Sequence, residues 1–407
     1  MIQGELDAIT SRFWEMRHER RDVEAYERYL DIFRLHSDGK SDAQVGRMLH
    51  MNNVGKYLKG QKRPFLATMA SWAERLGQPR EGWQWLPLSL RPRGTPGDEW
   101  IQVPTEVRYF RDISNVLNQL RPKDVSPEEL SDFGFSSRSG MENEKALLFG
   151  FFLGATIGDA GKHTKGESHF ESKSISLMLS MAKPNSLRFG EFATLSVRAS
   201  LGLAMHRIAD SPMSTGRYSK AACFQWLTPS SPLLAWVFHV CLGLKKGELT
   251  TYDALRMPWL LNSPARFKVA VLQGVCESDG WVDAAADTAC FVSSPNTTLF
   301  SRLLERLNTP YRVDRQKLVE VTRIPTSYAA GLCLFNSRIR SVYYRQLSCM
   351  SKATRLPERV RLRSEVVGWI QELAAHNGRI SEICLALATK YHIKVAGNTV
   401  RRYTQFL

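Results

Sequence analysis

Two apolar segments of this chain, 120 residues apart, carry small residues at the same spacing and end on an aspartate. The first, from residue 152 to 161, is FLGATIGDAG, and the second, from residue 271 to 280, is VLQGVCESDG. Small residues four positions apart share one face of a helix, and their missing side chains let a partner helix approach to backbone contact. We therefore expect two helices packed together along the face formed by Gly150, Gly154, Gly158, Ala270, Gly274 and Ser278.

The same order of elements follows each segment. SISLMLSM, starting at Ser174, alternates like a strand and precedes KPNS and a helical run, and TACFVS, starting at Thr288, precedes SPNT and a second helical run. Asn185 and Asn296 then stand at the expected N-caps of those helices. We expect two copies of one unit, related by a pseudo-twofold axis along the paired helices. This symmetry would bring Asp159 and Asp279 together.

The two aspartates are predicted to share a metal site. Carboxylates held close together repel and raise each other's pKa unless a cation lies between them. An acid at the C-terminal end of a helix is also unfavourable with the helix dipole, which favours a functional explanation. Mg²⁺ or another hard divalent cation accepts two carboxylates together with water and phosphate oxygens, and can assist phosphodiester cleavage.

FLGATIGDA and LQGVCESDG resemble the two motifs of the LAGLIDADG homing endonucleases in their single-chain form, over roughly residues 141 to 350. The resemblance implies an α+β fold with two αββαββα-type repeats, saddle-shaped antiparallel sheets and internal pseudo-twofold symmetry in a monomer. It implies a site-specific endonuclease for double-stranded DNA, with metal bound at the motif ends by Asp159, Asp279, Gly158 and Ser278. One departure is Ala160, where the family usually has Gly, so the turn after Asp159 is in question.

The resemblance also suggests where the core would meet DNA. Residues after the first motif would lie on a saddle in the major groove, and the candidates are Lys162, His163 and Lys165. Basic groups near the scissile phosphates are expected on strand-like pieces of each half, and the candidates are Lys220 and Lys317.

Both ends of the chain resemble helix-turn-helix domains. Near the start, Ser41 is a candidate N-cap, and a helix, a turn and the pattern YLKGQKRP follow it. The predicted DNA-binding residues here are Asn52, Asn53, Lys56, Lys59, Lys62 and Arg63. At the other end we expect a helix capped by Ser381 and a last helix whose DNA-binding residues are Asn398, Thr399, Arg401 and Arg402.

These patterns divide the chain into five parts: a helical domain over 1–90, a linker over 91–140, repeats over 141–260 and 261–350, and a basic helical domain over 351–407. The formal net charge is +15, and residues 338–407 alone hold 13 Lys or Arg against four Asp or Glu. This excess favours a polyanionic partner, with DNA the first candidate. Seven scattered cysteines with no CxxC pair, no signal peptide and no membrane span predict a cytoplasmic, nucleoid-associated protein.

Two other functions agree with the same features. The fold could serve a non-catalytic DNA-binding transcription regulator with helix-turn-helix domains, because a fold does not fix an activity. Its basic surfaces could also serve RNA maturation or processing. We do not expect an intein from the chain as given, because it begins Met1-Ile2 and ends Gln405-Phe406-Leu407, without the residues that splicing needs.

Overall fold

A computed structural model of the protein describes most of the chain beyond residue 100 and two short pieces before it. The described residues are 40–48, 88–90, 101–104, 106–134, 138–162, 175–182, 187–208, 223–244, 248, 253–316, 319–357, 360–376 and 378–405. Several predicted site residues lie outside these ranges, namely Asn52, Asn53, Lys56, Lys59, Lys62, Arg63, His163, Lys165, Lys220 and Lys317.

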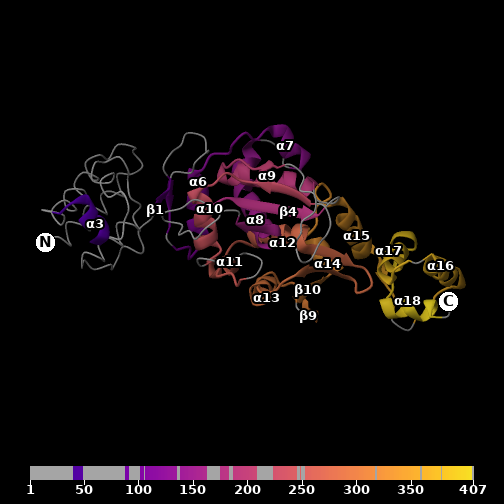
Figure 1. Ribbon diagram of the computed structural model, residues 1–407. Coiled ribbons are helices and arrows are strands. Elements are labelled where there is room, and N and C mark those ends of the chain that lie inside the picture. The colour runs from indigo at the N-terminus through magenta and orange to yellow at the C-terminus, as the bar shows by residue number, and fades with distance from the viewer. Residues whose placement is uncertain are drawn as a thin grey trace.

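Two helices, α8 (Arg138–Asp159) and α12 (Ala265–Asp279), pack along each other in the middle of the molecule (Figure 1). Their apolar side chains, such as Phe152 and Leu272, are buried in the core. Both helices end on the aspartate of their motif, so the end of each helix is the end of the pattern seen in the sequence.

A four-stranded antiparallel sheet begins directly after each of these helices. The first sheet has the order β3-β4-β6-β5 and contains β3 (Ala160–Lys162), β4 (Leu177–Ala182), β5 (His206–Arg207) and β6 (Cys223–Leu227). The second has the order β7-β8-β10-β9 and contains β7 (Gly280–Asp283), β8 (Thr288–Val292), β9 (Arg312–Gln316) and β10 (Val319–Pro325). The prediction of a mixed fold with antiparallel sheets is confirmed.

One face of each sheet is covered by a helix. In the first sheet Trp226 packs on α9 (Leu187–Leu201), where a Cβ added to Gly190 would lie only 2.0 Å from the indole ring. In the second, Phe291 packs on Phe300 of α13 (Thr297–Arg306), with 5.2 Å between ring centroids. Successive side chains of a strand point to opposite faces of the sheet. The residue next to each of these rings along its strand therefore points away from the covering helix.

Shorter elements complete the core and lead into it. They are β1 (Leu88–Leu90), β2 (Ile101–Val103), α6 (Phe110–Gln119), α7 (Pro127–Asp132), α10 (Pro232–Trp236), the π-helix η3 (Val237–Cys241), α11 (Pro258–Leu261) and α14 (Thr326–Gly331). Helix α3 (Asp42–Met48) is described near the start of the chain. No helix within the described ranges is both long and apolar enough to cross a membrane.

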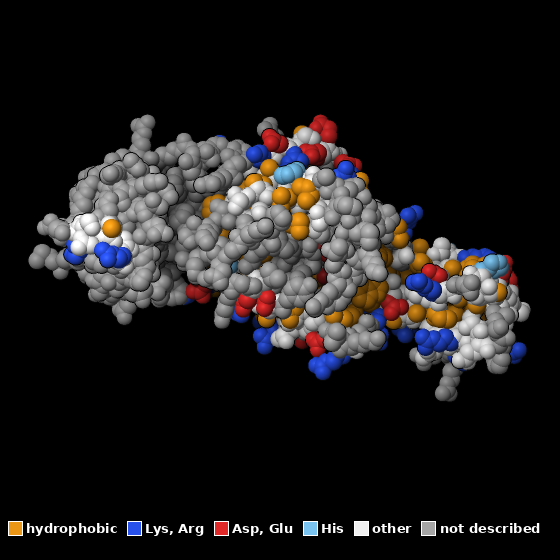
Figure 2. Space-filling view, viewed as in Figure 1, with side chains coloured by type: hydrophobic (Ala, Val, Ile, Leu, Met, Phe, Trp, Pro, Cys, Tyr) orange, Lys and Arg blue, Asp and Glu red, His pale blue; other side chains and the backbone are white. Residues whose placement is uncertain are grey.

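The C-terminal elements lie together at one end of the molecule (Figure 1). They are α15 (Ser341–Lys352), β11 (Thr354–Arg355), α16 (Ser364–Ala375), α17 (Ile380–Lys390), β12 (Ile393–Lys394) and α18 (Gly397–Thr404). Strands β11 and β12 pair in parallel and connect α15 to the last helices. Figure 2 shows Lys and Arg side chains in several places on this part of the surface.

Of the four predicted helix caps, Asn185 lies outside the described residues, and the other three have different outcomes. Ser41 caps α3 as expected, because its Oγ accepts a hydrogen bond from Gln44 N at 3.4 Å. Asn296 stands at the N-cap of α13, but its Oδ1 accepts from Leu255 N at 2.7 Å instead of binding its own helix. Ser381 is not a cap, because α17 begins one residue earlier with Arg379 at the N-cap, whose N–H donates to Glu382 Oε2.

Candidate active site

Helices α8 and α12 cross at backbone contact. A Cβ added to Gly154 would lie 2.0 Å from Val271 O and 2.9 Å from Gly274 Cα, and one added to Gly274 would lie 2.2 Å from Phe151 O. The distances of 2.0 and 2.2 Å to carbonyl oxygens are far below any real Cβ contact, so neither position can hold a larger residue unless the helices separate. The crossing point therefore depends on glycine in both helices.

The next small pair brings the acids together. A Cβ added to Gly158 would lie 1.9 Å from Ser278 Oγ and 3.5 Å from Asp279 Oδ2. The Ser278 hydroxyl lies within hydrogen-bonding distance of two carbonyl oxygens of its own helix, Gly274 O at 3.0 Å and Val275 O at 2.9 Å, so it stays within its own helix. The last residue of α8 and the last residue of α12 are consequently neighbours.

Burial and mutual repulsion destabilise the charged forms of both acids. Burial raises the pKa of the Asp159 carboxyl well above its ordinary value, the nearby Asp279 carboxylate raises it further, and Arg340 acts in the opposite direction. Burial also raises the pKa of Asp279 to about 6, again against the lowering effect of Arg340. Asp159 Oδ2 is buried and has no hydrogen-bond partner among the described residues, so its capacity to accept a bond is unused there.

Arg340, just before α15, is the cation of the site, and nothing in the sequence pattern pointed to it. Its Nη1 donates to the backbone carbonyls of Glu277 at 2.7 Å and Ser278 at 3.2 Å. These are the last two residues before Asp279, so the guanidinium lies at the C-terminal end of α12. The charge also complements the helix dipole at that end.

Glu277 lies near the same end of α12, and its side chain is buried. Its Oε1 accepts a hydrogen bond from Asn336 N at 2.5 Å, while its Oε2 has no partner in the part of the chain that the structure describes. Burial raises the pKa of Glu277 to about 8, although the Asn336 hydrogen bond and the charge of Arg340 both lower it. The segment from Asn336 to Arg340 therefore contacts α12 through a backbone N–H at one end and a guanidinium at the other.

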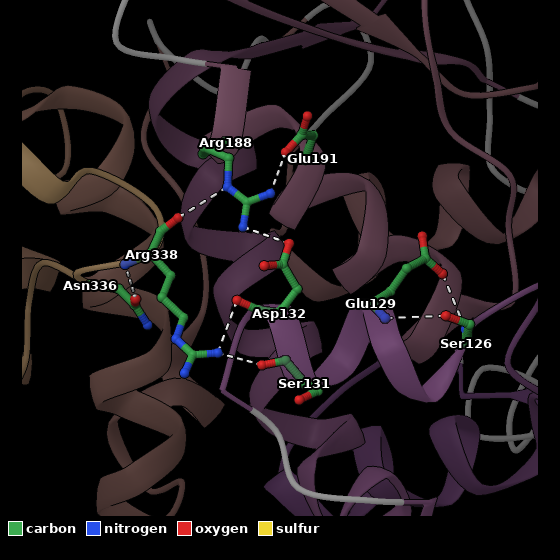
Figure 3. Close-up of polar contacts among 8 residues, drawn as sticks. All are labelled: Ser126, Glu129, Ser131, Asp132, Arg188, Glu191, Asn336 and Arg338. Atoms are coloured by element: carbon green, nitrogen blue, oxygen red, sulfur yellow. Dashed lines mark hydrogen bonds and ion pairs between the residues drawn. The ribbon is translucent and has the colours of Figure 1, made fainter.

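The same segment also binds the first half of the core (Figure 3). Arg338 Nη1 donates to the backbone carbonyls of Ser131 and Asp132 at the end of α7. In return, Arg188 Nε of α9 donates to Arg338 O at 3.3 Å, and Arg188 Nη2 forms an ion pair with Asp132 at 2.7 Å. The segment from Asn336 to Arg340 thus joins the two halves beside the acids.

The residues at this site fit a hard divalent cation. Asp159 and Asp279 offer a cation two carboxylates, and within the described ranges no third His, Cys, Asp or Glu side chain joins them in a group that could hold a metal. The other oxygens would come from backbone carbonyls, water and the bound ligand, which is how Mg²⁺ is usually held. The unpartnered Asp159 Oδ2 supports this fit, because leaving a buried oxygen unsatisfied costs about 1–3 kcal/mol.

The faces of the sheets that point away from the helices carry different side chains in the two halves. On the second sheet Arg323 forms ion pairs with Asp283 at 2.7 Å and Asp314 at 2.5 Å, so its charge is balanced within the face. On the first sheet Met178 and Leu227 pair across the corresponding strands. Lys162 lies on β3 at the edge of that sheet.

The C-terminal helices present three of their four predicted DNA-binding residues to solvent. Asn398, Arg401 and Arg402 are exposed on α18. Thr399 differs from the expectation, because it is only 1% exposed and its side chain is buried within the C-terminal part. Arg402 Nη2 lies 3.4 Å from its hydroxyl, within hydrogen-bonding distance.

This C-terminal part is attached to the turn between β7 and β8. Lys394 Nζ of β12 lies 3.1 Å from both carboxylate oxygens of Asp287. Thr326 Oγ1 also donates to Asp287 Oδ1, at 2.5 Å, and Gly397 N donates to Ala285 O at 3.1 Å. The start of α18 is therefore held against the second sheet by a buried ion pair and a backbone hydrogen bond.

Comparison with known proteins gives structural neighbours only. No protein-family model matches the sequence, and none of the curated proteins matches it. Similar solved structures include I-DmoI in complex with DNA and Mn, at 14% identity and TM-score 0.33 over 48% of this chain and 98% of that one. They also include the homing endonuclease I-WcaI bound to its DNA recognition sequence, at 12% identity and TM-score 0.32 over 54% and 98%. These neighbours are homing endonucleases.

Proposed function

We propose that this chain is a site-specific endonuclease that hydrolyses double-stranded DNA with a divalent cation, Mg²⁺ or a similar ion, bound between Asp159 and Asp279. The observation that carries the proposal is the meeting of two partly buried carboxylates at the ends of two helices in backbone contact, with Asp159 Oδ2 unpartnered among the described residues. Nothing in the packing of the core requires acids there, and burial works against both of them.

Each group at the site would have a separate task. The carboxylates of Asp159 and Asp279 would bind the ion, with the carbonyls of Gly158 and Ser278 beside them. The bound cation would stabilise negative charge that develops on the phosphodiester oxygens. Arg340 opposes the effect of burial on the acids, because its charge lowers the pKa of both. The contacts between α8 and α12 hold the carboxylates at a fixed separation.

The other predicted residues belong to the same proposal. We propose a monomer with two pseudo-symmetric repeats and the five domain boundaries given above, in contact with duplex DNA. Exposed Asn398, Arg401 and Arg402 would contact DNA from α18. The roles of Lys162, of the N-terminal residues and of Lys220 and Lys317 remain proposals from the resemblance.

The experiment is cleavage of a genomic DNA library in the presence of Mg²⁺, with the new ends mapped by sequencing. Asp159→Asn and Asp279→Asn should each reduce cleavage at any mapped site by more than about 100-fold, because each removes a proposed ligand of the ion. Glu128→Gln, an exposed charge change on α7, is the matched control and should cut like the parent. Cleavage by the double Asn variant at the parental rate would refute the mechanism.

A non-catalytic DNA-binding regulator is the second candidate, and Arg340 is the observation that favours it. A site that already contains a fixed cation beside its acids can stay folded without metal. This candidate predicts salt-sensitive binding to a specific duplex without Mg²⁺-dependent nicking. Binding of a selected duplex with no new ends under any divalent ion would favour it over the endonuclease. Competition between duplex DNA and structured RNA would test the RNA-processing function.

A further inference from the structure

Arg340 is held at the acid pair by backbone atoms. Its Nη1 donates to the carbonyls of Glu277 and Ser278, and its guanidinium lies 4.3 Å from the ring centroid of Tyr343. A guanidinium stays protonated at any physiological pH. The positive charge at the end of α12 is therefore permanent, and its position does not depend on the ionisation of a neighbouring side chain.

The segment that carries Arg340 is also fixed at other points. Asn336 N donates to Glu277 Oε1, and Arg338 donates to the carbonyls at the end of α7, as Figure 3 shows for the latter. Arg188 of α9 donates a hydrogen bond to the backbone carbonyl of Arg338. Movement of the guanidinium away from the acids would break its hydrogen bonds to α12, and movement of the whole segment would also break the bonds to α7 and α9. We therefore expect the guanidinium to remain when a cation enters.

We infer that Arg340 is a built-in counter-cation of the acid pair, which stabilises the metal-free site and competes with a divalent ion for it. The inference rests on the proposed function, because it concerns the same two carboxylates. Two effects act together. The fixed charge repels a dication at short range. The guanidinium also donates a hydrogen bond to the Ser278 carbonyl oxygen, which is one of the oxygens proposed for the ion.

The first test is the affinity of the protein for Mn²⁺, measured by isothermal titration calorimetry in the absence of DNA. Arg340→Gln should bind Mn²⁺ at least about threefold more tightly than the parent, because a repelling charge is removed. Arg340→Lys keeps the charge and should remain closer to the parent. Arg345→Gln, which removes an exposed arginine from the same helix region, is the matched control and should leave the affinity unchanged. Equal or weaker binding by Arg340→Gln would overturn the inference.

The second test covers the case in which Arg340→Gln does not fold alone. In EDTA, Asp159→Asn should restore stability to the Arg340→Gln chain, because it removes the repulsion between the two carboxylates that the arginine otherwise offsets. A purely structural role in capping α12 predicts that the two substitutions act additively, and additivity in urea unfolding would overturn the inference. A parent that binds no Mn²⁺ at all would instead refute the proposed function, while this test would still decide the role of Arg340.

Discussion

Gly154→Ala should destabilise the protein although alanine is the better helix former. The added Cβ would lie 2.0 Å from Val271 O and 2.9 Å from Gly274 Cα, and both obstacles are backbone. Helices α8 and α12 would have to separate by about 1 Å before the closest contact reached 3.0 Å. Overpacking of this kind costs about 1–3 kcal/mol and sometimes more, and the gain in helix propensity is about 1 kcal/mol. Because neither obstacle can change rotamer, we expect a net loss of about 2 kcal/mol.

The assay is urea denaturation, with the free energy of unfolding extrapolated to zero denaturant. Gly368→Ala is the matched control, since Gly368 lies inside α16 with nothing within 4 Å of an added Cβ. That variant should gain about 0.5–1 kcal/mol from propensity alone. If Gly154→Ala were as stable as the parent, the helices would not be in backbone contact. The pairing of Asp159 with Asp279 would then lose its structural basis.

Two further predictions concern buried charges. Asp287→Asn should lower the free energy of unfolding by about 3 kcal/mol, because Lys394, with 10% of its side chain exposed, loses its counter-charge. Adding Lys394→Met to that variant should recover part of the lost stability. Glu277 has its pKa raised to about 8, so its contribution to stability is present below pH 4.5 and is lost as the pH rises towards 8. Glu277→Gln can still accept a hydrogen bond from Asn336 N. It should remove a slope of about 1.4 kcal/mol per pH unit in the free energy of unfolding over that window, measured in EDTA. An unchanged slope would contradict the burial of this carboxyl.

The centre of the fold could be predicted because its signal is local and repeated. Gly154 and Gly274 occupy equivalent positions in two helices, and a glycine required by close packing leaves the same spacing in the sequence each time. The strands could be placed for a similar reason. The alternating segment before KPNS begins and ends within three residues of the bounds of β4 (Leu177–Ala182).

Arg340 could not be predicted, because its role depends on a fold-back of the chain. It stands 61 residues after Asp279, in a segment without helical or strand periodicity, and it binds carbonyl groups that carry no sequence signature. Asn296 shows the same limit on a smaller scale. The sequence placed it at the right helix end, but its amide binds Leu255 N, from a segment 41 residues earlier.

Ala160 shows how a departure from a motif can be tolerated. Gly280, its counterpart after α12, has φ −96°, a backbone angle that any residue adopts, so glycine is not needed there for a left-handed conformation. What Gly280 provides is space, because an added Cβ would lie 2.4 Å from Cys276 O. Ala160 continues directly from α8 into β3, paired with Leu179, and the acid before it remains beside Asp279.

The two sheets share a strand order but differ in the side chains that point away from the helices. On the second strand of one sheet Cys290 lies opposite Arg323, whereas on the second strand of the other sheet Met178 lies opposite Leu227. Paired residues share a face, so one sheet carries a largely buried arginine with two acidic partners where the other carries two apolar side chains. If both faces meet DNA as proposed, they offer it different side chains. The two halves of the target site should therefore differ in sequence, although the backbone that binds them is nearly repeated.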